Sequence, residues 1–175
     1  PLTAPDPLTC VFNGGKLLMH EASLSLPDMP TMAAAGADER NLQPVGMFGE
    51  RYCHTTWAEG DPPAPEGYAW RGLRSLFGAV DENLLAVAGR ASQIAEWART
   101  HRFCGACASP MEKVSGERCF KCINCAMTAY PRISPAMMVL IRKGDSYLMA
   151  MHIASPSKRF TPLAGFLEAG ESIEE

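Results

Sequence analysis

Four cysteines, arranged in two pairs, are the residues whose spacing most clearly predicts chemistry. Cys104 and Cys107 form one Cys-x-x-Cys pair, and after fourteen intervening residues Cys122 and Cys125 form a second. Each pair can turn two thiolates toward one point, and two pairs supply the tetrahedral sulfur set that zinc takes in structural sites. Because four sulfurs leave no ligand position open to water, we expect this zinc to stabilise the fold without taking part in a reaction.

A redox-active dithiol is the other chemistry open to a Cys-x-x-Cys motif. It would need a single pair that opens a helix after a strand, and the presence of two matching pairs argues against it. Cys119 lies close by but has no partner at this spacing, so we interpret it as a residue outside the site. Cys10, Cys53 and His54 are interpreted as core or surface residues for the same reason.

A second pattern lies near the end of the chain, where two glycines and two glutamates fall at fixed offsets. The residues are Leu163-Ala164-Gly165-Phe166-Leu167-Glu168-Ala169-Gly170-Glu171. A strand is expected before them, over 159–163, and a helix is expected to begin at Ser172. Glycine lets the backbone approach a ligand closely, and carboxylates suit a hard divalent cation. The alternative is an ordinary loop that leads into a helix.

The elements before the cysteines must position them. Residues 1–80 alternate short apolar stretches, such as 8–12 and 16–19, with loop compositions such as 33–38, which predicts a small and mostly β domain. A helix is expected over 81–101, because apolar residues recur there at three- and four-residue spacing and Asp81 can cap the first turn. Gly89 inside this helix is interpreted as a close-packing site.

The elements after the cysteines are expected to be strands. The apolar runs 136–141 and 146–151 predict a β-hairpin that turns at Lys143-Gly144-Asp145. Four methionines lie in these runs, and we expect them to pack in a core rather than to bind a soft metal: Met137, Met138, Met149 and Met151.

Composition and charge exclude several classes of protein. The chain has 175 residues, 47% of them hydrophobic, and a net charge of −3, as expected for one or two globular domains without a strongly basic nucleic-acid-binding surface. No segment has the character of a secretory signal, and no apolar run approaches the roughly 18 residues of a membrane span. Seven cysteines without such a signal favour the reducing cytosol and a metal site. The chain begins without Met and ends inside the second motif, so we expect a fragment of a longer protein.

The order of these features resembles the bacterial NADH pyrophosphatases of the Nudix family. The similar features are the four-cysteine ribbon, the segment Tyr130-Pro131-Arg132-Ile133-Ser134-Pro135, a hairpin, and the Gly165-x5-Glu171 spacing that opens the Nudix box. The resemblance is good over 70–175 and holds only in outline before that. It implies an α+β fold with a Nudix-like β-rich domain over 1–102, including the linking helix 81–101. A zinc ribbon over 103–130 and the start of a Nudix α/β/α sandwich over 131–175 would follow.

The resemblance also implies an activity. Members of the family hydrolyse the pyrophosphate bond of NADH or NAD to nicotinamide mononucleotide and AMP, and members also remove NAD caps from RNA. They are cytoplasmic homodimers, without membrane association, that use structural zinc and catalytic magnesium or manganese. The Glu-Glu metal ligands of the box have no counterpart before the end of this sequence, so we expect the 175-residue chain itself to be inactive.

Individual residues are assigned by the same resemblance. The zinc ligands are Cys104, Cys107, Cys122 and Cys125, and the substrate-binding positions are Arg74, Glu117, Tyr130 and Phe166. Phe166 matches an aromatic that stacks on the nicotinamide end of the substrate. The backbone carbonyl of Ala164 matches a contact to magnesium or manganese, and Glu171 matches a box glutamate that supports the metal-binding helix. Arg74 can equally be interpreted as an ordinary surface arginine.

Two other functions stay open. A zinc ribbon can be a nucleic-acid-binding module. The segment between Cys104 and Cys125, however, contains three basic and two acidic residues, so its net charge is far less positive than that of a dedicated nucleic-acid-binding surface. The remaining alternative is a catalytically inactive scaffold with a vestigial box.

Overall fold

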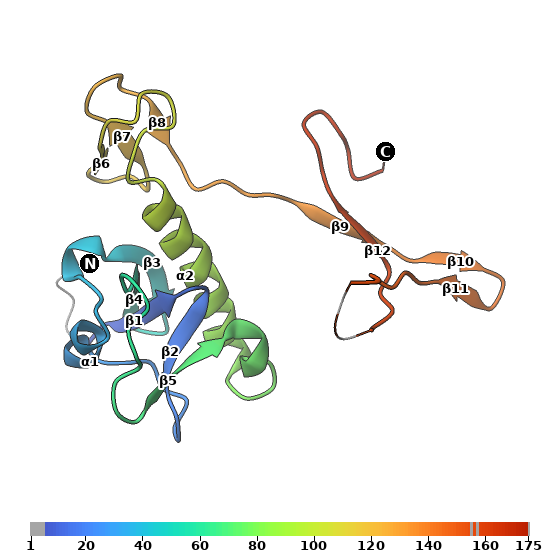
Figure 1. Ribbon diagram of the computed structural model, residues 1–175, viewed down its shortest axis with the longest axis horizontal. Helices are drawn as coiled ribbons and strands as arrows, with labels where there is room; N and C mark the ends of the chain where they lie inside the picture. The colour runs from blue at the N-terminus through green and yellow to red at the C-terminus, as the bar shows by residue number, and fades with distance from the viewer. Residues whose placement is uncertain (1–5, 155, 157, 175) are drawn as a thin grey trace. The chain divides into compact units, whose positions relative to one another are not determined.

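The structure is a computed structural model that describes residues 6–154, 156 and 158–174. The chain divides into two compact units, Pro1–Pro131 and Arg132–Glu175. Figure 1 labels the helices and strands of both units. The mixed α+β character expected from the sequence is confirmed.

A five-stranded mixed sheet forms the body of the first unit. Its strands are β1 (Leu8–Asn13), β2 (Lys16–His20), β3 (Gln43–Phe48), β4 (Arg51–Trp57) and β5 (Tyr68–Gly72), in the spatial order β3-β4-β1-β2-β5 (Figure 1). β1 runs parallel to β4, and the other neighbours are antiparallel. Gly14 and Gly15 join β1 to β2 with φ values of 52° and 76°, the left-handed geometry that a two-residue hairpin turn requires. The mostly β character expected for this region is therefore confirmed.

One helix packs on each face of this sheet. Helix α2 (Glu82–Thr100) shares a hydrophobic cluster with Cys10 and Phe12, whereas α1 (Met29–Ala34) shares a second cluster with Val11. This division follows from the strand, in which successive side chains point to opposite faces. Two 3-10 turns, η1 (Glu39–Asn41) and η2 (Leu73–Leu76), complete the region. In the described part of the chain, no helix combines the length and the hydrophobicity that a bilayer crossing needs.

The expected helix over 81–101 is confirmed, and α1 is an element that the sequence interpretation missed. Asp81 caps α2 by accepting hydrogen bonds from the backbone N–H groups of Asn83 and Leu84, at 2.9 and 3.2 Å. Helix α1 occupies part of a stretch interpreted as loop because of its small residues. The Asp28 carboxylate caps it by accepting from the Thr31 N–H at 2.9 Å, and that capping pattern was visible in the sequence.

Three short antiparallel strands follow α2 and form the ribbon. They are β6 (Met111–Lys113), β7 (Phe120–Cys122) and β8 (Thr128–Ala129). The ring of Phe120 lies 4.8 Å from that of Trp97 on α2 and packs against the same cluster as the sheet. An ion pair of 2.9 Å between Arg102 and Glu59 adds a second link. The ribbon is thus joined to the rest of the first unit by apolar packing and by charge.

The second unit contains two small antiparallel pairs. Strands β10 (Ile141–Lys143) and β11 (Ser146–Leu148) form the expected hairpin, and β9 (Ala136–Val139) pairs with β12 (Leu163–Phe166). The strand expected over 159–163 is therefore placed too early. Pro162 has no N–H to donate to a ladder, so regular pairing starts only after it. The expected helix start is also wrong for the described residues, because 173–174 form a turn.

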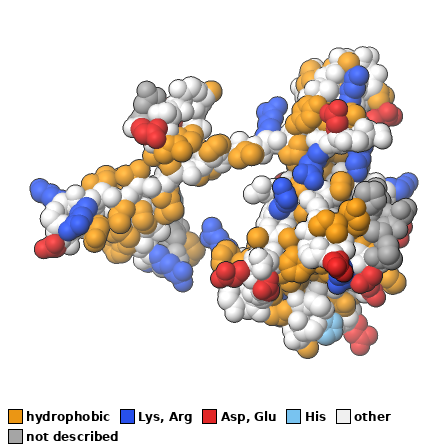
Figure 2. Space-filling model, turned by 180° about the vertical axis from the view of Figure 1, so that it is seen from behind, with side chains coloured by type: hydrophobic (Ala, Val, Ile, Leu, Met, Phe, Trp, Pro, Cys, Tyr) orange, Lys and Arg blue, Asp and Glu red, His pale blue; other side chains and the backbone are white. Residues whose placement is uncertain are grey.

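The expectation that four methionines pack in a core is wrong for the second unit as described. Met138 is 65% exposed, and Met149 and Met151 are also exposed. Figure 2 shows hydrophobic side chains covering much of this unit's surface. Paired strands need a second layer to bury a face, and residues 132–174 as described supply none.

Gly89 is not a close-packing site, because a Cβ added there would meet no described atom within 4 Å. We therefore predict that Gly89→Ala raises the free energy of unfolding by about 0.5–1 kcal/mol, the usual difference between glycine and alanine inside a helix. Urea unfolding followed by tryptophan fluorescence measures it.

Gly78→Ala is the matched control, because Gly78 has φ of 72° and alanine is strained there. This control should lose stability. A loss of stability for Gly89→Ala would show that the helix face at this position packs against another surface.

Candidate functional site

The four predicted zinc ligands converge in the ribbon. The Sγ of Cys107 lies 3.5 Å from the Sγ atoms of Cys122 and Cys125, and the Sγ of Cys104 lies 3.5 Å from that of Cys125. All four sulfurs lie within 4.8 Å of one another. With zinc–sulfur bonds of about 2.3 Å, a tetrahedral site separates its sulfurs by about 3.8 Å. The four cysteines therefore form a site that fits a zinc ribbon.

Tight turns of similar geometry aim the two pairs. The Ala106 N–H lies 3.4 Å from the Cys104 Sγ, and the N–H groups of Asn124 and Cys125 lie 3.4 Å from the Cys122 Sγ. The residue after each pair has a left-handed backbone, with φ of 58° at Ala108 and 61° at Ala126. Such a backbone is unfavourable for alanine, so both turns are held by the ribbon around them.

The sulfurs differ in how readily they give up a proton. Hydrogen bonds from the side chain and backbone of Ser109 lower the pKa of Cys107 to about 5. The Cys125 backbone N–H lowers the pKa of Cys122 as well. Although the Met127 backbone favours the Cys125 thiolate, the other three cysteines raise the pKa of Cys125 to about 12. Metal binding must displace the proton that stays on this last sulfur.

The remaining cysteines lie outside this site, as expected. Cys119 is buried, and its thiol lies 3.3 Å from the Phe120 carbonyl oxygen rather than among the four sulfurs. Cys10, Cys53 and His54 are buried in the sheet. Burial, with a smaller contribution from Cys53, raises the pKa of Cys10 to about 12, so this thiol is unreactive at neutral pH.

Two of the residues assigned to substrate binding meet at the surface of the ribbon. The Tyr130 hydroxyl donates a hydrogen bond of 2.8 Å to the Glu117 carboxylate, and the Tyr130 side chain is half-exposed. The Glu117 carboxylate, followed by Cys119, raises the pKa of Tyr130 to about 12. This hydrogen bond fixes the orientation of the phenol and leaves its ring accessible.

Arg74 is exposed in η2, which packs on β5 and α2. It makes no hydrogen bond or ion pair that the structure records, and its assignment to substrate binding stays a prediction.

The residues of the second motif lie on β12 and the turn after it. Phe166 is 73% exposed, so its ring does not pack in a core of the second unit. Ala164 pairs with Met138 of β9. The Glu171 carboxylate accepts a 2.9 Å hydrogen bond from the Glu168 N–H, the contact by which a glutamate stabilises the first turn of a helix. Gly165, expected in a loop, lies inside the strand.

The described residues do not form a site for magnesium or manganese. Apart from the four cysteines, no group of three potential side-chain ligands converges anywhere in the described ranges. The carboxylates of Glu168, Glu171 and Glu174 therefore do not form a metal-binding site on their own. Oxygen-ligand cations need several such groups, so the only metal contact suggested is the one implied by the resemblance, the Ala164 carbonyl, and Glu171 keeps its supporting role.

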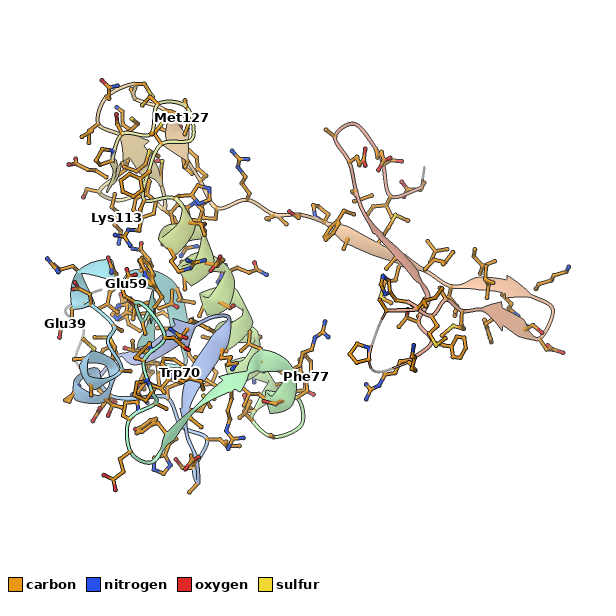
Figure 3. All side chains as sticks on the ribbon, viewed as in Figure 1. Glu39, Glu59, Trp70, Phe77, Lys113 and Met127 are labelled. Carbon is orange, nitrogen blue, oxygen red and sulfur yellow. The ribbon has the colours of Figure 1, made fainter. Side chains whose placement is uncertain are left out.

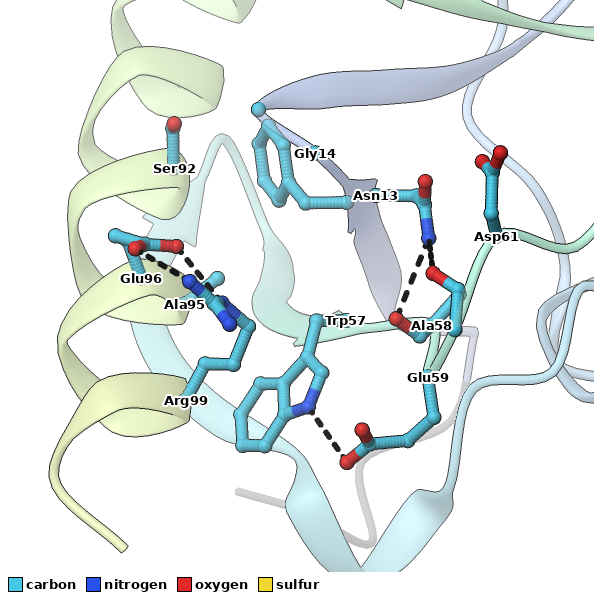
Figure 4. Close-up of a pocket in the computed structure, with 13 residues that line it drawn as sticks. Asn13, Gly14, Trp57, Ala58, Glu59, Asp61, Ser92, Ala95, Glu96 and Arg99 are labelled. Atoms are coloured by element: carbon cyan, nitrogen blue, oxygen red, sulfur yellow. Dashed lines mark hydrogen bonds and ion pairs between the residues drawn. The ribbon is translucent and has the colours of Figure 1, made fainter.

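A pocket of about 600 Å³ in the first unit was not foreseen from the sequence. It lies between α2, the β1–β2 turn and the chain after β4 (Figure 4). The Trp57 indole N–H donates to Glu59 at 3.1 Å, and Arg99 pairs with Glu96 at 2.7 Å. Most of the charged side chains that line this pocket are already paired. Few of them therefore remain free to bind a ligand.

Zinc removal should loosen the ribbon before the rest of the first unit, because metal binding and local folding are coupled. Cys122→Ser should lose bound zinc and lower the melting temperature, whereas Cys119→Ser should keep its zinc. Elemental analysis of the purified variants measures the metal, and hydrogen exchange after chelation should increase first over 103–126. Full zinc and unchanged melting in Cys122→Ser would disprove the assignment.

Tyr130 should ionise only as the pH approaches about 12, against 10.0 for an ordinary tyrosine. Because its pKa is higher in the folded state, the stabilisation by the Glu117 hydrogen bond is fully present below pH 10 and is lost toward pH 12. The difference in absorbance at 295 nm between the unsubstituted chain and Tyr130→Phe isolates this titration. Glu117→Gln should move it to lower pH, and an unchanged midpoint would contradict the proposed cause.

Comparison with known families matches both parts of the first unit. Residues 8–97 match the family described as NADH pyrophosphatase-like rudimentary NUDIX domain. Residues 99–126 match the family described as NADH pyrophosphatase zinc ribbon domain. The second match contains all four cysteines of the ribbon site.

Similar proteins cover almost the whole chain. A protein of Pseudomonas fluorescens named NAD-capped RNA hydrolase NudC is 40% identical over 171 residues, which are 98% of this chain and 58% of the relative. A protein of the same name from Deinococcus radiodurans is 35% identical over 175 residues, 98% of this chain and 60% of the relative. The chain thus spans more than half of the length of these relatives. The domain matches and the relatives together show that the chain belongs to the NADH pyrophosphatase family of Nudix proteins.

Proposed function

We propose that the protein is a Nudix hydrolase that cleaves the pyrophosphate bond of NADH or NAD, giving nicotinamide mononucleotide and AMP. The observation that carries this proposal is the similarity over 98% of the chain to proteins named NAD-capped RNA hydrolase. Removal of NAD caps from RNA is the same bond cleavage on a larger substrate, and we include it in the proposal.

Zinc has no part in the reaction under this proposal. Its four sulfur ligands occupy every tetrahedral position, so no water can be activated on it. A pyrophosphate repels an attacking hydroxide by its negative charge, and magnesium or manganese supplies the opposing charge in such reactions. The described residues do not form a site for such an ion, so we assign no catalytic step to them.

The described residues are proposed to bind substrate. Tyr130 and Glu117 present a fixed phenol and a carboxylate, and the 2.8 Å hydrogen bond between them supports a shared role. The exposed ring of Phe166 supports stacking on a flat ligand such as nicotinamide. Arg74, exposed and without a recorded partner, would suit a phosphate oxygen.

The proposed assembly is a cytoplasmic homodimer. The large exposed apolar area of the second unit supports further burial of this surface in an assembly, because single chains seldom leave such patches open. Sedimentation of the sample used for activity assays would give twice the chain mass.

An inactive zinc-ribbon scaffold is the alternative from another class. It predicts no turnover of NADH in any protein that contains these residues. The proposal is tested with the product of the longest reading frame that encodes the 175 residues, assayed for NADH hydrolysis with magnesium or manganese. Absence of turnover with both metals, in protein with bound zinc and cooperative melting, would favour the scaffold.

Phe166→Ala in that product should reduce kcat/KM for NADH by several-fold or more, because one aromatic stacking contact contributes on the order of 1 kcal/mol. The matched substrate is diadenosine diphosphate, which lacks nicotinamide and should be affected less. The melting temperature should stay the same, because Phe166 is exposed. Equal losses on the two substrates, or a large fall in melting temperature, would disprove the stacking role.

A further inference from the structure

Two basic side chains of the ribbon reach the edge strand of the sheet. The ammonium group of Lys113 on β6 lies 3.4 Å from the Leu42 carbonyl oxygen, just before β3. The Arg118 guanidinium donates a hydrogen bond of 2.9 Å to the Pro44 carbonyl oxygen on β3. Lys113 lies at the junction of the ribbon with the rest of the first unit (Figure 3). Both charges are thereby held in place along one side of β3, which is at the end of the sheet.

A third basic side chain comes from the helix. The Arg90 guanidinium on α2 lies 3.9 Å from the place where a Cβ on Gly46 would be. The three cations therefore lie along one short segment, with Lys113 at Leu42, Arg118 at Pro44 and Val45, and Arg90 beside Gly46. The register of β3 with β4 shifts between Pro44 and Gly46, so the segment is extended but not a regular strand throughout. We call Arg90, Lys113 and Arg118 the basic strip.

The basic strip has no carboxylate partner. The ion pairs recorded for the described residues join other side chains, and none includes a member of the strip. Burial, followed by repulsion from Arg118, lowers the pKa of Lys113, as expected where like charges gather. Figure 2 shows basic side chains close together on the face between the ribbon and the body of the first unit. In a chain of net charge −3, this is a local concentration of positive charge that an anion would relieve.

We propose that the basic strip binds the phosphodiester backbone of single-stranded RNA, as the surface that holds the RNA chain behind an NAD cap. The inference rests on the proposed function, and it adds a binding surface for the RNA part of a capped substrate. Several cations spaced along a line suit a chain of phosphates better than one phosphate group. Backbone contacts of this kind position a nucleic acid without reading its sequence, so binding should be insensitive to base composition.

The anchoring of two cations should strengthen such binding. Lys113 and Arg118 already contact backbone carbonyl oxygens of residues 42–45, so little side-chain freedom remains to be lost when phosphates bind. These two side chains also join the ribbon to the sheet, so their substitution can alter structure. Arg90 has no recorded hydrogen bond or ion pair in the described residues, and it is therefore the cleaner residue to change.

The test measures binding of a fluorescein-labelled, unstructured twelve-nucleotide RNA without a cap to the full chain, by anisotropy at several salt concentrations. Three phosphate contacts predict a slope of log K against log salt of about −2, since each contact with a single strand contributes about −0.7. Arg90→Gln should weaken binding about three- to tenfold and make the slope shallower by about 0.7. Lys113→Gln should act in the same direction with zinc content unchanged.

Arg99→Gln is the matched control, because Arg99 lies on the same helix but is paired with Glu96 and is not part of the basic strip. It should leave both affinity and slope unchanged. Binding that is unaffected by both Arg90→Gln and Lys113→Gln would overturn the proposal. Displacement of the RNA by inorganic phosphate at the same phosphate concentration would show that the basic strip is a site for one phosphate group, against the proposal. Equal displacement by polyglutamate would show that it binds any anion, which would also contradict the proposal.

The result is independent of the proposed enzyme activity. The RNA has no cap and is not hydrolysed, so a protein that failed to cleave NADH would still show the salt dependence. Conversely, an active NADH hydrolase with no effect of Arg90→Gln on RNA binding would contradict only the present inference.

Discussion

The packing of helix α2 on the sheet is the interaction on which the rest of the first unit depends. Its buried face consists mainly of alanines, which let the helix lie close to β1 and β4. At this contact the Thr55 hydroxyl lies 3.2 and 3.1 Å from the carbonyl oxygens of Cys10 and Ala91, so a polar group is buried with its hydrogen-bonding capacity used. The last turns of α2 also carry Trp97, whose ring contacts Phe120. The same helix therefore builds the core and supports the ribbon.

This arrangement makes the placement of the ribbon a consequence of the core. The Trp97–Phe120 contact is apolar and belongs to the main cluster, whereas the contacts of Lys113 and Arg118 with residues 42–45 are polar and lie at the sheet edge. Two attachments of different kinds, made by different elements, restrict rotation of the ribbon more than either would alone. A surface shared by the ribbon and the sheet can then present charges at fixed distances.

Local patterns predicted those parts of the structure whose cause is local. The four cysteines needed only their spacing, and α2 needed only its apolar repeat and the Asp81 cap. The parallel pairing of β1 with β4 was not visible, because it joins segments about 45 residues apart and no local residue choice requires it. The methionines of the second unit were misjudged because an apolar strand specifies that a side chain can be buried, not that a covering layer is present.

The candidate site shows the same division. Tyr130 and Glu117 were assigned separately by resemblance, and only the folded ribbon reveals their hydrogen bond. Net charge gave no indication of the basic strip, since composition averages over the whole chain whereas the strip collects residues 28 positions apart in sequence.

The left-handed backbone at Ala108 and Ala126 has a consequence for how the protein responds to its surroundings. Each left-handed alanine costs roughly 1–2 kcal/mol relative to an ordinary backbone conformation. Together the two lower the equilibrium constant for closing the metal-free ribbon by at least an order of magnitude. Glycine at these positions would remove that cost and let the ribbon close without help. With alanine in both, a higher concentration of free zinc is needed to close the ribbon. In this sense the two methyl groups make the fold sensitive to the metal supply of the cell.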